Sequence, residues 1–180
     1  MGRLFNAMGY LLKGISLKTL YRDSVSVSGL GRIAPSTKII TKNNGKVRFS
    51  KNVRICENSS ISCDGGIISV GENVGINKNM IMSCHGEITI GSNTLFAPNV
   101  CIYDHNHKFD KNGISDGYSV GSVRIGSKCW IGVNAIILRN TVIGDGCIIG
   151  AGCVVSGVIP PHSIVTSNRE LRIVPVEDRK

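Results

Sequence analysis

The sequence has few aromatic residues, few prolines and no long apolar run. Aromatic residues make up 5% of the 180 residues, and the 5 prolines lack the period of three that collagen requires. No run of 18 apolar residues is present, and no small-residue cleavage site follows the N-terminal apolar segment, so we expect neither a membrane-spanning helix nor a signal peptide. The hydrophobic fraction of 42% predicts one folded domain and excludes general disorder.

The sequence also lacks closely spaced cysteine pairs, and it has fewer acidic than basic residues. The 7 cysteines contain no C-x-x-C pair, which favours free thiols in a reducing cytoplasm and gives no metal-ligand spacing. The 21 basic residues outnumber the 12 acidic residues, and the net charge of +9 favours an anionic partner. The basic residues form no tract with interleaved aromatic residues, so we expect no nucleic-acid binding.

Glycine is abundant, with 22 residues, and the chain carries a repeat of six residues. Stepping by six from Ile125 reaches an aliphatic residue each time, and the fourth residue after each is small. The aliphatic track is Ile125, Ile131, Ile137, Ile143, Ile149 and Val155, and the small track is Cys129, Ala135, Thr141, Cys147 and Cys153. The same register appears upstream at Val70, Ile76 and Met82, at Ile90, Phe96 and Ile102, and more weakly at Phe49, Ile55 and Ile61.

A repeat of this kind, over roughly residues 47–159, predicts a parallel β-helix. Each hexad gives a short flat strand and a tight corner, and three hexads close a triangular coil of about 18 residues. The aliphatic side chain fills the interior, while the small residue lets successive corners stack. We therefore interpret Cys129, Cys147 and Cys153 as packing residues.

The hexad phase is lost between Ile102 and Ile125, where a polar insertion carries two of the four histidines. Loops held by a rigid scaffold are common places for function. Asp104, His105, Asn106 and His107 come at the root of this loop, and Asp110 follows. We therefore expect the functional site there.

The predicted organisation has three parts. Residues 1–23 form an amphipathic helix with basic residues between its apolar positions, residues 24–166 form the β-helix with a protruding loop at 104–121, and residues 167–180 form a tail. Two interpretations of residues 1–22 stay open: they pack across the end of the β-helix, or they lie against the inner face of a membrane.

Several segments together resemble the hexapeptide-repeat acyltransferases, above all the galactoside, maltose and polysaccharide O-acetyltransferases. They are the Ile-Gly hexads, Ala97-Pro98-Asn99-Val100, His107 eight residues after Asn99, Trp130-Ile131-Gly132 and Ile159-Pro160-Pro161. The resemblance covers about residues 47–170. It implies a left-handed β-helix, a homotrimer, and acetyl-CoA and a sugar or glycan acceptor that meet between adjacent subunits.

In that family a loop histidine removes the proton from the acceptor hydroxyl while the hydroxyl attacks the thioester directly. The position that matches this base is His107, with His105 as the rival, and Asp104 or Asp110 would orient the ring. A main-chain N–H would stabilise the oxyanion. We expect His105 and His107, on one extended segment, to point opposite ways.

The resemblance also implies binding residues. Trp130 matches an aromatic residue that lines the thioester and acceptor pocket. Cofactor contacts would come from Ala151, Ser156 and Gly157 along the later coils, and from Arg169 or Arg172 for phosphates, although Leu171 occupies the family's usual basic position. Acceptor contacts would come from Asn77, Asn79, His85 and Asn99, and asparagine also suits tight corners.

The leading hypothesis is therefore acetyl transfer from acetyl-CoA to a hydroxyl of a sugar or cell-surface glycan precursor. Three alternatives remain: N-acetylation of an amino sugar, a zinc enzyme with His85, His105 and His107 as ligands, and a scaffold without catalysis. The opposite directions expected for the two loop histidines count against zinc.

Overall fold

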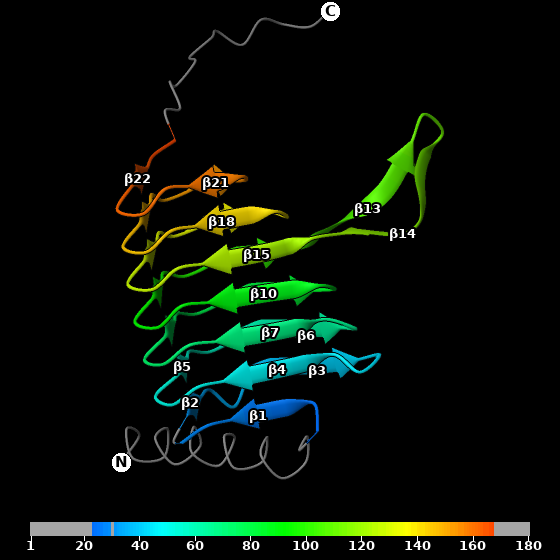
Figure 1. Cartoon of the computed structure of the whole chain (residues 1–180). Coiled ribbons are helices and arrows are strands. Elements are labelled where there is room, and N and C mark those ends of the chain that lie inside the picture. Colours follow the sequence, from blue (N-terminus) through cyan, green and yellow to red (C-terminus); the bar gives the residue numbers. More distant parts are fainter. Residues whose placement is uncertain (1–22, 30, 168–180) are drawn as a thin grey trace, which may run out of the picture.

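The computed structural model describes residues 23–29 and 31–167, in which every regular element is a β-strand. Three parallel sheets form the faces of a prism, and one antiparallel hairpin projects from it (Figure 1). The first sheet contains, in spatial order, β1 (Val25–Val27), β4 (Lys46–Phe49), β7 (Ile67–Val70), β10 (Glu87–Ile90), β15 (Ser122–Ile125), β18 (Thr141–Ile143) and β21 (Val158–Ile159).

The other two faces are built in the same way. The second sheet contains β2 (Arg32–Ile33), β5 (Arg54–Ile55), β8 (Gly75–Ile76), β11 (Leu95–Phe96), β16 (Trp130–Ile131), β19 (Ile148–Ile149) and β22 (Ile164–Val165). The third sheet contains β3 (Lys38–Lys42), β6 (Ser60–Asp64), β9 (Ile81–Cys84), β12 (Cys101–Tyr103), β17 (Ile136–Ile137) and β20 (Val154–Val155). In Figure 1 the front strands run to the left and the rear strands to the right while the chain climbs, which makes the coil left-handed. The predicted fold is confirmed.

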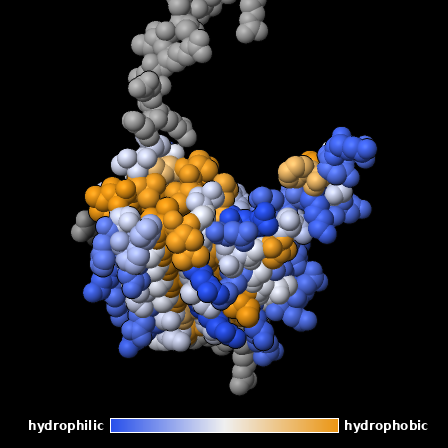
Figure 2. Space-filling model, turned by 45° about the horizontal axis from the view of Figure 1, so that its top comes forward, coloured by the Kyte–Doolittle hydropathy of each residue, from blue (hydrophilic) through white to orange (hydrophobic). Residues whose placement is uncertain are grey.

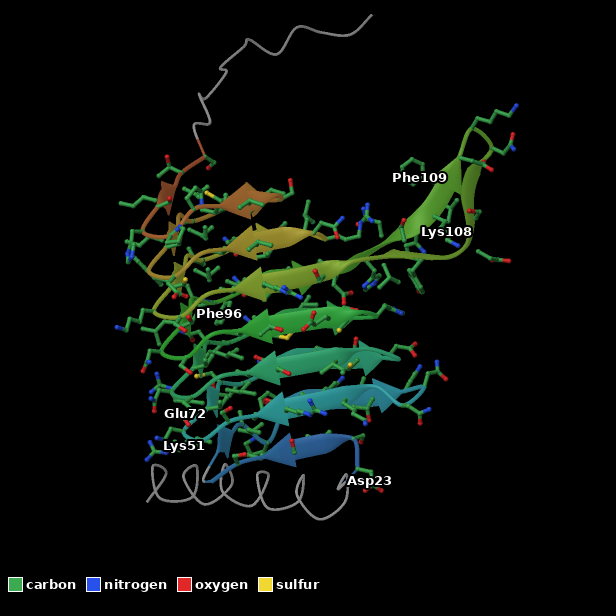
Figure 3. The ribbon with its side chains drawn as sticks, in the orientation of Figure 1. Asp23, Lys51, Glu72, Phe96, Lys108 and Phe109 are labelled. Atoms are coloured by element: carbon green, nitrogen blue, oxygen red, sulfur yellow. The ribbon has the colours of Figure 1, made fainter. Side chains whose placement is uncertain are left out.

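The interior of the prism is a column of aliphatic side chains. Every aliphatic residue of the predicted hexad track is at most 3% exposed, and the small track is buried as well. Phe96, which lies inside the prism in Figure 3, fills a wide part of the column at 3% exposure. Cys129, Cys147 and Cys153 are buried free thiols, as predicted.

The coils are longer at the N-terminal end than the expected 18 residues. The register advances by 22 residues from Ile39 to Ile61, by 21 from Ile61 to Met82 and by 20 from Met82 to Ile102. It advances by 18 in coils after the hairpin, for example from Trp130 to Ile148 and from Ile137 to Val155. The extra residues explain why the hexad phase is weak upstream.

Three edges join the faces, and we number them in chain order. Edge I joins the first sheet to the second, at residues 51–52, 72–73, 92–93, 127–128 and 145–146. Edge II joins the second to the third, at residues 78–79, 98–99, 133–134 and 151–152. Edge III joins the third to the first, at residues 65–66, 85–86, 138–140 and 156–157, and carries the hairpin. At edge I, Lys51 and Glu72 form an ion pair of 3.4 Å (Figure 3).

Asparagine ladders run along edges I and II. Their members adopt positive φ near 60°, which asparagine tolerates better than most residues. Their amides bond from coil to coil, with 3.0 Å from Asn79 Nδ2 to Asn99 Oδ1 and 3.1 Å from Asn99 Nδ2 to Asn134 Oδ1. The corners are therefore fixed by backbone geometry and by side-chain hydrogen bonds together.

Figure 2 shows apolar side chains gathered at the C-terminal end of the prism and near the tip of the hairpin, with smaller apolar patches on the side of the prism. At the C-terminal end Val158 is 75% and Ile164 69% exposed. On the hairpin Phe109 and Ile114 are opposite each other, at 76% and 81% exposure. Within the described ranges no helix is long and apolar enough to cross a bilayer.

Candidate active site

The polar insertion is a hairpin of β13 (His105–Asp110) and β14 (Gly113–Val120) that leaves the prism at edge III (Figure 1). The predicted protruding loop is therefore present, as two paired strands. The pairing shifts register between His107 and Lys108. Lys108 and Phe109 lie out along the hairpin in Figure 3. Asp104, His105 and His107 lie at its root, where the chain enters β13.

The carboxylate of Asp104 is fully buried at this root. It accepts the backbone N–H of His85 at 2.9 Å and that of Gly86 at 2.7 Å. It also lies 2.9 Å from Nδ1 of His105. Because a carboxylate only accepts, the hydrogen of this bond is on Nδ1, which leaves the Nε2 lone pair of His105 available to a substrate proton.

The carboxylate of Asp104 reaches the preceding coil because the backbone of Gly86 lies close to that of Gly121. A Cβ added at Gly86 would lie 2.4 Å from the carbonyl oxygen of Gly121, at the point where the hairpin returns to the prism. A side chain at residue 86 would therefore push the hairpin root away. Gly86 thus holds Asp104 and the hairpin against the coil below.

Four aromatic rings gather around this carboxylate. The ring of His85 lies 4.1 Å from that of His105 and 4.2 Å from that of Tyr118, between centroids. The ring of Tyr118 lies 5.0 Å from His105 and 4.8 Å from His107. We name His85, His105, His107 and Tyr118 the ring cluster.

The expectation that the two loop histidines point opposite ways is wrong. Both rings contact Tyr118, because residues two apart on a strand project to the same face. Three histidines therefore share the site. Even so, no group of three or more His, Cys, Asp or Glu in the described ranges has an arrangement that could hold a metal ion.

The histidines differ in environment. Burial lowers the pKa of His85, and the neighbouring His105 lowers it further. The side chain of His105 is only 11% exposed, whereas His107 is exposed. His107 also lines a hollow of ≈ 290 Å³ with Arg139 and residues of both hairpin strands.

Asp110, the other residue expected to orient a histidine, lies at the hairpin tip. Its carboxylate accepts the backbone N–H of Asn112 at 2.7 Å and closes the turn. Asp104 is thus the carboxylate that holds a loop histidine.

A second group of predicted residues lies on another face. Trp130 and Asn77 line one hollow of ≈ 240 Å³ on the second sheet, beside Ala97 and Pro98. Trp130 is 55% exposed. Asn77 bonds through its Oδ1 to the N–H of Lys78 at 2.9 Å.

The remaining predicted residues divide between two edges. Asn79, Asn99 and Ala151 lie on edge II, and the amides of Asn79 and Asn99 are engaged in the ladder. Ser156 and Gly157 lie on edge III, in a coil beyond the hairpin. Arg169, Arg172 and the predicted N-terminal helix lie outside the described residues.

Sequence reasoning missed Tyr118 and Arg139. Tyr118 comes 11 residues after His107 in a segment without periodicity, and only antiparallel pairing makes the two residues Cα partners. A hairpin prediction from Lys111-Asn112-Gly113, where asparagine and glycine favour a turn, is the signal that would have found it.

Comparison with known proteins places this geometry in a family. Residues 122–157 match the family described as bacterial transferase hexapeptide (six repeats). WbbJ of Escherichia coli K12, named a putative lipopolysaccharide biosynthesis O-acetyl transferase, is 32% identical over 137 residues, which cover 69% of each chain. The chain belongs to the hexapeptide-repeat transferase family. It spans only 45% of another relative, a probable acetyltransferase of Mycobacterium tuberculosis that is 31% identical over 136 residues.

Solved structures agree with this membership. A maltose O-acetyltransferase from Clostridium difficile 630 is 28% identical, with a TM-score of 0.55 over 98% of this chain and 82% of that one. The N-acyltransferase AntD from Bacillus cereus, crystallised with coenzyme A and an amino-sugar nucleotide, shares the fold at 19% identity, with a TM-score of 0.62 over 96% of this chain and 88% of that one. This hexapeptide-repeat transferase thus has O-acetyl and N-acyl transferases among its neighbours.

Proposed function

We propose that this hexapeptide-repeat transferase moves an acetyl group from acetyl-CoA to a hydroxyl of a saccharide, with His107 as the general base. The observation that carries the proposal is the ring cluster at edge III, built on the buried carboxylate of Asp104. Membership in a transferase family and WbbJ's assignment to lipopolysaccharide biosynthesis support the reaction and the acceptor class.

His107 suits this role because it is exposed and lines a hollow that an acceptor can enter. A neutral imidazole accepts the hydroxyl proton as the oxygen attacks the thioester carbonyl, and the proton later leaves with the CoA thiolate. Tyr118 packs against the His107 ring and limits its orientations. No covalent intermediate with the enzyme is required.

His105 is the second candidate for the base, and one observation favours it. Its Nδ1 is fixed by Asp104, so its ring is already oriented with Nε2 as the acceptor. Its 11% exposure means that a substrate would have to reach it past Tyr118. In the preferred assignment, Asp104 and His105 hold the root of the hairpin from which His107 projects.

A complete site requires two copies of the chain. His107, Ser156 and Gly157 lie at edge III, whereas Trp130, Asn77 and Ala151 lie on or beside edge II, at the other side of the third sheet. In a homotrimer, edge III of one subunit would meet edge II of the next. Each of the three sites would then receive its histidine and its tryptophan from different subunits.

The outer face of the third sheet is suited to this assembly. Outward positions from β6 to β20 carry a single charge, on Asp64 at the end of β6 beside edge III, where its carboxylate accepts the amide of Asn43. The other outward positions are uncharged: Ser60, Ser62, Ile81, Ser83, Cys101, Tyr103, Ile136 and Val154. Ile81 is 41% and Val154 54% exposed in a single chain. A partly apolar face with little charge between the two halves of a site is typical of a subunit interface.

The test is release of the CoA thiol from acetyl-CoA, followed with a thiol reagent, over a panel of neutral sugars, amino sugars and diphosphate-linked sugars. Acceptor-dependent release on a hydroxyl acceptor is the expected result. Release only with amino sugars would replace O-acetylation by N-acetylation. Absence both of turnover and of acetyl-CoA binding by calorimetry would contradict the proposal.

A further inference from the structure

A long groove runs over the second sheet, away from Trp130 toward the N-terminal coils. One hollow of ≈ 390 Å³ is lined by Gly31, Arg32, Asn52, Arg54, Asn73, Val74, Gly75 and Leu95. The smaller hollow beside Trp130 shares Arg54, Gly75 and Leu95 with it. The two hollows are therefore adjacent, with the arginines at one end and the tryptophan at the other, and we call them together the groove.

The two hollows meet at Gly75, over which the Leu95 side chain packs. Gly75 is the Cα partner of both Arg54 and Leu95 on the neighbouring strands. A Cβ added there would lie 2.8 Å from Cδ2 of Leu95 and 3.7 Å from Nη2 of Arg54. Leu95 Cδ2 therefore occupies the space that a side chain at residue 75 would fill, and the Arg54 guanidinium lies just beyond it.

Arg32 and Arg54 place two positive charges side by side. They are Cα partners on β2 and β5, about 4.8 Å apart as neighbouring parallel strands are. Neither has a carboxylate within ion-pair distance among the described residues, whereas Arg124 pairs with Glu87 at 3.2 Å. Two guanidinium groups that line one hollow without an acidic partner repel each other, and a dianion bound there removes that repulsion.

We propose that this groove binds the diphosphate of an acceptor whose sugar lies against Trp130. The inference deepens the proposed function, on which it rests, by naming a diphosphate-linked saccharide as the acceptor class. Two adjacent phosphates share one bridging oxygen and lie within one strand spacing, so each guanidinium can take one phosphate through paired N–H donors.

The length of the groove fits an acceptor of this kind. From Arg54 to Trp130 the register passes through Gly75 and Leu95, which is three strand spacings or about 14 Å. That span leaves room for the saccharide between the diphosphate and the aromatic ring. The flexible Arg54 side chain can shorten the distance, and Leu95, 51% exposed, supplies an apolar wall.

Binding without turnover gives the first test. Inorganic pyrophosphate and UDP are titrated by calorimetry into the full chain with the CoA site saturated by CoA. Binding that falls at least 10-fold in Arg32→Gln/Arg54→Gln, and that weakens with added salt, is the expected result. The matched control is Arg48→Gln on the outer face of the first sheet, which should bind like the wild type.

Two results of this titration would overturn the inference. Equal binding by the wild type and the double arginine variant would remove the arginines from the site. Pyrophosphate binding that is seen in a parallel titration without CoA, but is absent when CoA is present, would assign the arginines to CoA and not to the acceptor. Failure of the transferase reaction alone would leave the titration unaffected, so the two proposals fail separately.

Kinetics give the second test and distinguish the sources of the diphosphate. UDP-N-acetylglucosamine and N-acetylglucosaminyl geranyl diphosphate serve as the nucleotide and lipid forms. The double arginine variant should raise KM at least 10-fold for the better of the two and leave an uncharged glucosaminide unchanged. Gly75→Val, whose side chain would displace Leu95 and crowd the Arg54 guanidinium, should act in the same direction. An equal KM increase for the uncharged sugar would contradict diphosphate recognition.

Discussion

The carboxylate of Asp104, fully buried, lies 2.9 Å from Nδ1 of His105, whose ring reaches the surface of the hairpin root. The same carboxylate accepts the N–H groups of His85 and Gly86 from the coil below. One side chain therefore ties the hairpin to the β-helix and orients a histidine. The stability of the fold and the geometry of the site are coupled at this residue.

Asp104→Asn should lower the free energy of unfolding by about 1–3 kcal/mol, because an amide keeps one acceptor and turns N–H donors toward backbone N–H groups. Denaturant unfolding of the two proteins measures the difference. Asp116→Asn, an exposed change on the hairpin, is the control and should stay within about 0.5 kcal/mol of the wild type. Equal stability of Asp104→Asn and wild type would show that the buried carboxylate is not needed.

Asn79 allows a test of the edge II ladder. It has φ 60° and donates its amide to Asn99. Asn79→Ala should cost about 1–2 kcal/mol more than Asn79→Gly, since alanine resists positive φ and glycine does not. Thermal unfolding of both variants gives the comparison. Equal destabilisation of the two variants would mean that the loss of stability comes from the missing side-chain hydrogen bond to Asn99 and not from the backbone conformation.

The lowered pKa of His85 predicts a pH dependence of stability. Since the folded protein holds this ring neutral at pH values where the unfolded chain is protonated, the unfolded chain binds more protons there. Stability should therefore fall as pH is lowered through the ordinary histidine range, and this loss should end below the folded pKa. Unfolding midpoints between about pH 5 and 8, for wild type and His85→Asn, should show a shallower decline in the variant. Parallel curves would remove His85 as the cause.

Mixed oligomers test whether each site is shared between subunits. His107→Ala and Trp130→Ala should each be nearly inactive alone. Refolded together in equal amounts, they should recover about one quarter of wild-type activity, because one site in four then combines an intact histidine with an intact tryptophan. No recovery above the separate variants would place both residues in a site within one chain.

The prism could be predicted from the sequence because each hexad places one aliphatic residue on a strand and one small residue next to a corner. The Ile125 track holds its phase over six positions, and all six side chains are buried. The coil lengths upstream could not be predicted, since the residues added near His85 and Gly86 break that phase without a pattern of their own.

The location of the site could be predicted, but not its internal geometry. A polar insertion with two histidines marked the hairpin, and the family resemblance supplied His107. The contact of Asp104 with His85 and Gly86 joins residues 18 and 19 positions apart, and depends on the stacking of two coils. The groove from Arg54 to Trp130 likewise arises only when four strands lie side by side.

The most direct test of the proposed chemistry compares acceptor-dependent CoA release by wild type, His107→Ala and His105→Ala, at saturating acetyl-CoA. The proposal predicts a loss of about 10²–10⁴-fold in His107→Ala, with acetyl-CoA binding retained, and a smaller loss in His105→Ala. Full activity of His107→Ala together with an inactive, folded His105→Ala would contradict the assignment and make His105 the base.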